Sequence, residues 1–170
     1  MMFFFNKIDM YDVWTRGVLC LVIMLLLGGV ALGQVDEARQ AIEQGEYVLA
    51  VNILSEILAS RPDPDAYLYL GIAYRHMKEY QKAEDTFNEG SQRYPNDSRF
   101  QNELANLFLE NNDIQSAKSA LRRALAVDPS NSYASDQLAS IDMSTGDVEA
   151  ALKAWNKSGR PLINDILNNY

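Results

Sequence analysis

Apolar residues in the middle of this chain recur at intervals of three and four positions. One run contains Tyr67, Leu70 and Tyr74, and a later run contains Leu104 and Phe108. An α-helix brings residues at these intervals onto one side, so the pattern predicts helices with one buried face. We therefore expect an all-α protein built from amphipathic helices.

A longer pattern repeats over most of the chain. Four alanines spaced by 33, 34 and 34 residues mark equivalent positions, namely Ala50, Ala83, Ala117 and Ala151. Four residues after each alanine comes a large apolar residue, which is Leu54, Phe87, Leu121 or Trp155. Small residues at fixed positions allow two helices to approach closely. We interpret each copy as two helices joined by a tight turn.

A candidate turn residue stands five positions before each alanine. These residues are Gly45, Lys78, Asn112 and Gly146. Glycine and asparagine tolerate the positive φ that a helix C-terminus followed by a tight turn requires. Three of the four residues therefore fit such a turn, and Lys78 is the exception.

The copies resemble the tetratricopeptide repeat, a helix–turn–helix unit of about 34 residues. The copy at 98–131 matches well, the copy at 34–63 matches only in its second helix, and the copy at 132–160 is divergent, with Asp142 where an aromatic residue is usual. The resemblance implies a right-handed solenoid of three to four stacked repeats, because one helix pair cannot bury its apolar face alone. The strongest copy, 64–97, matches the family at Tyr67, Leu70, Gly71, Tyr74, Ala83, Phe87, Gly90 and Pro95.

The last ten residues, 161–170, are predicted to form a short helix that caps the stack. Pro161 begins this segment, and apolar residues then follow at helical spacing. A stack needs such a cap because its terminal repeat otherwise exposes apolar surface. The alternative is that this segment completes a partner's groove or begins a further domain.

An uncharged apolar run from Gly17 to Gly33 follows Arg16. Ala31 and Gly33 are small residues in the arrangement that signal peptidase accepts. We expect residues 1–33 to be an export signal, which places the protein in the periplasm or cell envelope. An uncleaved membrane anchor formed by residues 17–33 and a buried core helix are the alternatives.

Charge and composition exclude several function classes. The chain has 170 residues and a net charge of −8, which argues against nucleic-acid binding because that needs a basic surface. With one cysteine and one histidine, Cys20 and His76, it offers no disulfide scaffold, zinc cluster or catalytic triad. We expect no enzyme activity, no metal and no cofactor, and we interpret His76 as a surface or groove residue.

The family resemblance also implies a concave groove that binds another protein. Asn102 and Asn106 match the amide part of the clamp with which some family members hold a terminal carboxylate. Leu68 and Ile72 stand where basic clamp residues are needed, so we reject a carboxylate clamp. The implied groove residues are Arg39, Glu43, Asp65, Leu68, Tyr69, Ile72, Arg75, His76, Arg99, Asn102, Glu103, Asn106, Glu110, Tyr133, Asp136, Ser140 and Met143.

This mixture of apolar, aromatic and amide side chains suits an extended peptide or an amphipathic helix from another protein. The function predicted from the sequence is a non-catalytic adaptor that helps to assemble a complex in the cell envelope. Two alternatives stay open. The chain could be a structural module that forms a homo-oligomer, or an accessory domain of an exported enzyme or outer-membrane machine.

Overall fold

The structure is a computed structural model that describes residues 33–147, 149, 150 and 152. Most of the expected export segment, the second helix of the fourth copy and the expected cap at 161–170 lie outside these residues. The described part is helical and contains no strand, which confirms the all-α repeat fold. Its helices are residues 33–43, α2 Tyr47–Ser60, α3 Pro64–His76, α4 Tyr80–Arg93, α5 Arg99–Glu110, α6 Ile114–Val127 and α7 Ser132–Ser144.

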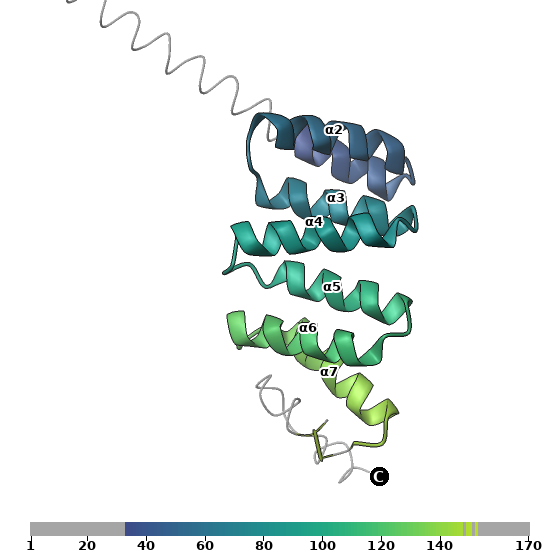
Figure 1. Cartoon of the computed structure of the whole chain (residues 1–170), viewed down its shortest axis with the longest axis vertical. Helices are drawn as coiled ribbons and strands as arrows, with labels where there is room; N and C mark the ends of the chain where they lie inside the picture. Colours follow the sequence, from purple (N-terminus) through teal and green to yellow (C-terminus); the bar gives the residue numbers. More distant parts are fainter. Residues whose placement is uncertain (1–32, 148, 151, 153–170) are drawn as a thin grey trace, which may run out of the picture.

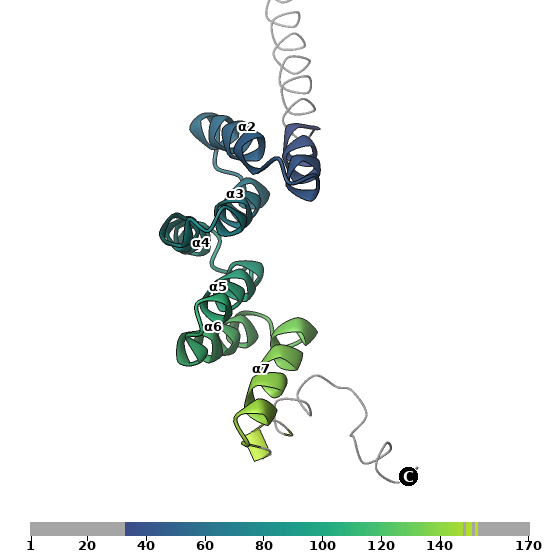
Figure 2. The same ribbon diagram turned by 90° about the vertical axis from the view of Figure 1, so that its right-hand side faces the viewer.

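The helices form a stack of two layers (Figure 1). We call residues 33–43, α3, α5 and α7 the first helices, and α2, α4 and α6 the second helices. Figure 2 shows the second helices along one side of the stack and the first helices along the other. The row of first helices is curved, since residues 33–43 and the start of α7 lie farther to the right than α3 and α5 in Figure 2, away from the second helices. The second helices are nearer the viewer in Figure 1.

Every turn between a first helix and the following second helix has the same backbone conformation. The φ angles are 81° at Gly45, 60° at Lys78, 58° at Asn112 and 82° at Gly146. The turn after α3 is closed by the backbone N–H of Glu79, which donates to the carbonyl oxygen of Tyr74 at 2.9 Å. The expected positive φ is confirmed at the glycines and the asparagine, and Lys78 adopts it as well.

Replacing Lys78 with glycine is expected to raise the free energy of unfolding by about 1 kcal/mol. A residue with a Cβ is strained in the left-handed conformation, whereas glycine adopts it freely. Urea unfolding measures the change. Arg122→Gly, in the exposed middle of α6, is the control and should lower the free energy of unfolding by about 1 kcal/mol. Two changes of the same sign would contradict the assigned turn.

Two aromatic rings pack against glycines of neighbouring helices and help to hold the layers together. The rings of Phe87 and Phe100 are fully buried. A Cβ added to Gly71 in α3 would lie 2.3 Å from Cε1 of Phe87, and a Cβ added to Gly90 would lie 2.3 Å from Cε1 of Phe100. The glycines therefore allow a helix backbone to lie directly against an aromatic ring, which is the close approach that the repeated small residues predict.

The divergent residue of the fourth copy, Asp142 in α7, is buried against a partner. Its side chain is 2% exposed and forms an ion pair with Lys118 of α6, whose side chain is 12% exposed. A carboxylate is costly to bury unless a cation accompanies it. Lys118 therefore explains how this helix accommodates an acid where related repeats have an aromatic residue.

Candidate functional site

The residues predicted to line a groove lie on the first helices. Asp65, Tyr69, Ile72, Arg75 and His76 of α3 are half-buried or exposed, and so are their counterparts on residues 33–43, α5 and α7. We call this surface the first-helix face. Leu68 differs because it is only 7% exposed and belongs to the hydrophobic core. The predicted groove residues on residues 33–43, α5 and α7 are Arg39, Glu43, Arg99, Asn102, Glu103, Asn106, Glu110, Tyr133, Asp136, Ser140 and Met143.

Arg99 at the start of α5 connects two acidic residues. Its Nη1 lies 2.8 Å from Oδ1 of Asp65 in α3, and its Nη2 lies 2.6 Å from Oδ2 of Asp97. Partial burial alone would raise the pKa of Asp97, but the hydrogen bonds from Arg99 outweigh it and hold that pKa below its usual value. The bonds to Asp97 also raise the pKa of Arg99. The positive charge of Arg99 is therefore already paired with two carboxylates of the protein itself.

Arg75 near the end of α3 makes a second bridge to α5. Its guanidinium lies 3.5 Å from the carboxylate of Glu103 and also pairs with Glu110. The side chain of Arg75 is 15% exposed, whereas that of Glu110 is 40% exposed. The arginine therefore lies beneath its acidic partners, which are nearer the solvent.

The two asparagines of α5 are joined to the next repeat. Asn106 accepts a hydrogen bond from the hydroxyl of Tyr133 in α7 at 2.6 Å and donates to Glu103 at 3.4 Å. Asn102 accepts one from the amide of Asn131 at 3.3 Å. These amides belong to the set of side chains that the sequence indicates for binding an extended peptide. In the structure they already link α5 to α7, so a bound segment would compete with these bonds.

His76 is exposed at the end of α3 and has an aromatic neighbour. Its ring stacks on Tyr47 at the start of α2, with centroids 5.1 Å apart and an interplanar angle of 3°. This contact links the first two repeats. Among the described residues, no group of three or more His, Cys, Asp and Glu side chains is placed to hold a metal ion.

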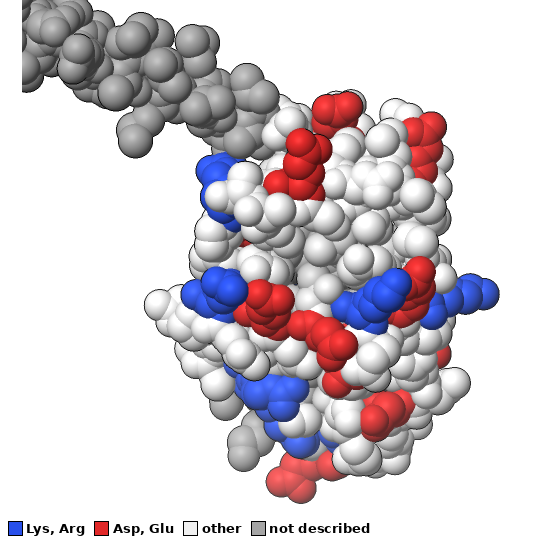
Figure 3. Space-filling view, turned by 45° about the horizontal axis from the view of Figure 1, so that its top comes forward, with Lys and Arg blue, Asp and Glu red and all other residues white. Residues whose placement is uncertain are grey.

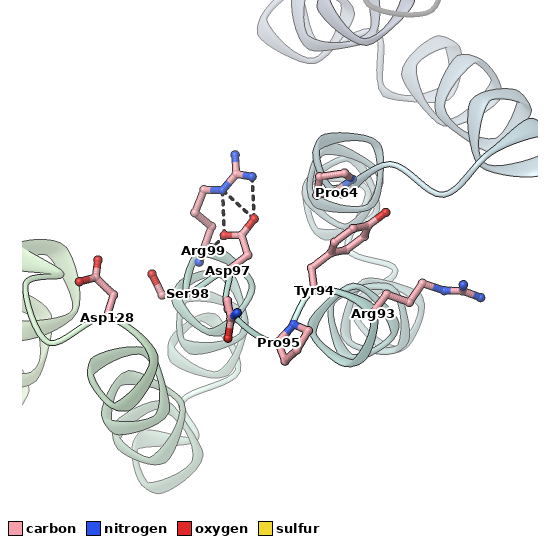
Figure 4. Close-up of a pocket in the computed structure, with 9 residues that line it drawn as sticks. Pro64, Arg93, Tyr94, Pro95, Asp97, Ser98, Arg99 and Asp128 are labelled. Atoms are coloured by element: carbon pink, nitrogen blue, oxygen red, sulfur yellow. Dashed lines mark hydrogen bonds and ion pairs between the residues drawn. The ribbon is translucent and has the colours of Figure 1, made fainter.

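An open pocket of about 680 Å³ adjoins the first-helix face at the start of α5 (Figure 4). Figure 4 shows Arg99 turned toward Asp97 on one side, with Pro95 and Tyr94 on the other. The pocket walls come from the α4–α5 turn, the first residue of α3 and the α6–α7 turn. The lining residues are Pro64, Arg93, Tyr94, Pro95, Asn96, Asp97, Ser98, Arg99 and Asp128.

Several residues that shape this surface were not predicted. Asp36, which pairs with Arg39, was detectable because acids and bases three or four residues apart meet on a helix. Asp97 and Asn131 lie just before α5 and α7, where the resemblance supplies no position. Tyr47 lies on a second helix, and only the packing of α2 against α3 brings it to His76.

Two sequence comparisons identify the repeats. A tetratricopeptide repeat model matches residues 41–107, and a second one matches residues 102–161. Together they span most of the chain and overlap by a few residues within α5.

The chain belongs to the tetratricopeptide repeat family. A curated relative is cellulose synthase operon protein C of Pseudomonas fluorescens (strain SBW25), which is 35% identical over 102 residues. That match covers 59% of this chain and 8% of the relative, so the tetratricopeptide repeat chain corresponds to a small part of that protein.

Solved tetratricopeptide repeat structures share the fold at low sequence identity. MamA of Desulfovibrio magneticus RS-1 is 19% identical with a TM-score of 0.61, covering 75% of this chain and 73% of MamA. The Yersinia enterocolitica type III secretion chaperone SycD, in complex with a peptide of the translocator YopD, is 19% identical with a TM-score of 0.60 (66% and 92% covered). The first repeat domain of Spaghetti (RPAP3), bound to an HSP90 peptide, is 20% identical with a TM-score of 0.60 (68% and 93% covered).

Within the described residues, no helix has the length and apolar character needed to cross a membrane.

Proposed function

We propose that this tetratricopeptide repeat protein is a non-catalytic adaptor that binds a segment of another protein on its first-helix face. The observation that carries the proposal is the arrangement of α3, α5 and α7. Their predicted binding residues lie in one layer and are tied together by Asp65–Arg99, Arg75–Glu103 and Asn106–Tyr133 contacts. Such cross-helix contacts hold the surface in shape before a ligand arrives, which lowers the cost of binding.

Two fold relatives support this use of the architecture. The SycD and Spaghetti structures each contain a peptide of another protein. Function does not follow from fold alone, so the proposal depends on the surface of this chain. Tyr69, Ile72, Tyr133 and Met143 place aromatic and apolar atoms there, and Tyr133 and Met143 are 41% and 53% exposed. Exposed large apolar side chains on a shaped surface are typical of interaction sites.

The proposal places the adaptor in the cell envelope, where it would assist complex assembly. The apolar run from Gly17 to Gly33 supports an exported location. A curated relative that is named for a cellulose synthase operon is consistent with such a setting. The envelope location and the partner are both part of the proposal.

Site-specific photo-crosslinking in intact source cells tests the function. A photo-reactive amino acid replaces Tyr69 or Met143 on the first-helix face, and Val48 of α2, which is 63% exposed, is the control position. We expect adducts with one other protein in the envelope fraction from the first two positions and none from Val48. Adducts from Val48 alone would contradict the proposal. Adducts only with a second copy of the chain would replace it with the self-associating alternative.

A further inference from the structure

Every arginine of the described first helices contacts two carboxylates. Arg39 lies 3.5 Å from Asp36 and 3.4 Å from Glu43, each measured from a guanidinium nitrogen to a carboxylate oxygen. Arg75 and Arg99 have two acidic partners each in the same way. Three arginines thus form ion pairs with six carboxylates, and the same arrangement occurs in three successive repeats.

The charge differs between the two layers. The first helices contain 3 basic and 8 acidic residues, a net charge of −5. The second helices contain 5 basic and 4 acidic residues, a net charge of +1. The Lys118–Asp142 ion pair joins the two layers. Without these two residues, the net charge is −4 for the first helices and 0 for the second helices. The side that carries the second helices is seen obliquely in Figure 3, where basic and acidic side chains are interspersed.

At two of the three arginines, Arg39 and Arg75, the acidic partners are more exposed than the arginine side chain. Asp36 and Glu43 are 67% and 63% exposed, whereas Arg39 is 44% exposed. Likewise, the side chain of Glu110 is more exposed than that of Arg75. A ligand that approaches residues 33–43 or the end of α3 therefore meets carboxylates before guanidinium groups, whereas at the start of α5 Arg99 is at least as exposed as its two acidic partners.

We infer that the partner segment is cationic, with lysine or arginine on its polar side and apolar residues on the side that contacts Tyr69, Ile72, Tyr133 and Met143. This inference rests on the proposed function and specifies its ligand. A carboxylate accepts several hydrogen bonds, so each acid can hold its arginine and a ligand cation together. A negatively charged segment would face net repulsion and would have to break existing ion pairs. Complementary charge also speeds association and rejects wrong partners.

Two fluorescent amphipathic peptides with the same apolar residues test the inference. One carries lysine at every polar position, and the other carries glutamate. Fluorescence anisotropy with the full chain measures both affinities at low and at high salt. We expect the lysine peptide to bind at least about ten-fold more tightly at low salt, with the difference shrinking as salt screens the charges.

Charge variants locate the effect on the molecule. Glu43→Gln with Glu110→Gln removes two acids from the first-helix face and should weaken binding of the lysine peptide about three- to ten-fold. The control pair, Glu56→Gln with Asp85→Asn, makes the same net change on exposed positions of α2 and α4 and should change affinity less than about two-fold. Arg39→Gln should tighten binding about two-fold, which a damaged fold would not do.

Equal or tighter binding of the glutamate peptide would overturn the inference, and so would binding of neither peptide. Equal weakening by the control pair would also overturn it, because the effect would then come from net charge alone. Each of these results leaves the proposed function standing if Tyr69 and Met143 still crosslink to another protein. Crosslinks from Val48 alone would instead remove the proposed function and the inference with it.

Discussion

Replacing Phe87 with alanine is expected to lower the free energy of unfolding by about 3–5 kcal/mol. The ring is fully buried in the core cluster that joins α3, α4 and α5. It rests against Gly71, which has no side chain that could move into the space left behind. The cost of such a substitution rises with the cavity that remains, so this site should lie toward the upper end of the range. Urea unfolding followed by circular dichroism measures it.

Asn88→Ala is the matched control for this experiment, because Asn88 is the exposed neighbour of Phe87 in α4. It should change the free energy of unfolding by less than about 0.5 kcal/mol. If Phe87→Ala moved the unfolding midpoint no further than Asn88→Ala does, the register of the repeats would be wrong.

Replacing Lys118 with methionine is expected to lower the free energy of unfolding by about 3 kcal/mol. The substitution keeps the apolar stem but leaves the carboxylate of Asp142, which is 2% exposed, without its cation. An unpaired charge buried between α6 and α7 is costly. Thermal unfolding should show the loss as a lower midpoint.

The double variant Lys118→Met with Asp142→Leu separates charge burial from lost packing. It should recover most of the stability, because replacing both members of a buried ion pair with apolar residues is often neutral. Arg122→Met, an exposed cation on the same helix, should change the free energy of unfolding by less than about 0.5 kcal/mol. A double variant no more stable than Lys118→Met alone would contradict the assigned role of the pair.

The helices and their turns were predictable because the causes are local in the sequence. Spacing of three and four defines the buried faces, and Gly45, Asn112 and Gly146 suit the turn backbone. Lys78 was unexpected at such a turn because lysine has no preference for positive φ. The packing of α3 against α4 imposes that conformation, and the residue adopts it at a cost in stability.

The contacts across the candidate site were not predictable to the same degree. Family positions placed Arg75 and Glu110 on one surface, but these residues are 35 positions apart, and their pairing depends on how α3 packs beside α5. The carboxyl group of Asp97 reaches Arg99 from a turn. Leu68 was expected on the surface and lies in the core instead, because this position of α3 points between α3 and its neighbours.

The location of the excess carboxylates follows from the assignment of the helices to layers rather than from composition. A net charge of −8 says that the chain is acidic, but not which layer carries the charge. Once the helices are assigned to layers, most of the excess falls on the first helices. A surface of this kind would select partners by charge as well as by shape.

Nuclear magnetic resonance of the isotopically labelled chain tests the central claim most directly. Backbone amide shifts are compared with and without the segment of the partner that the crosslinks at Tyr69 and Met143 identify. We expect the largest changes on α3, α5 and α7, with α2 and α6 nearly unchanged. The claim that this protein binds its partner on the first-helix face would be contradicted by changes confined to the second helices. It would also be contradicted if a saturating concentration of the segment caused no changes.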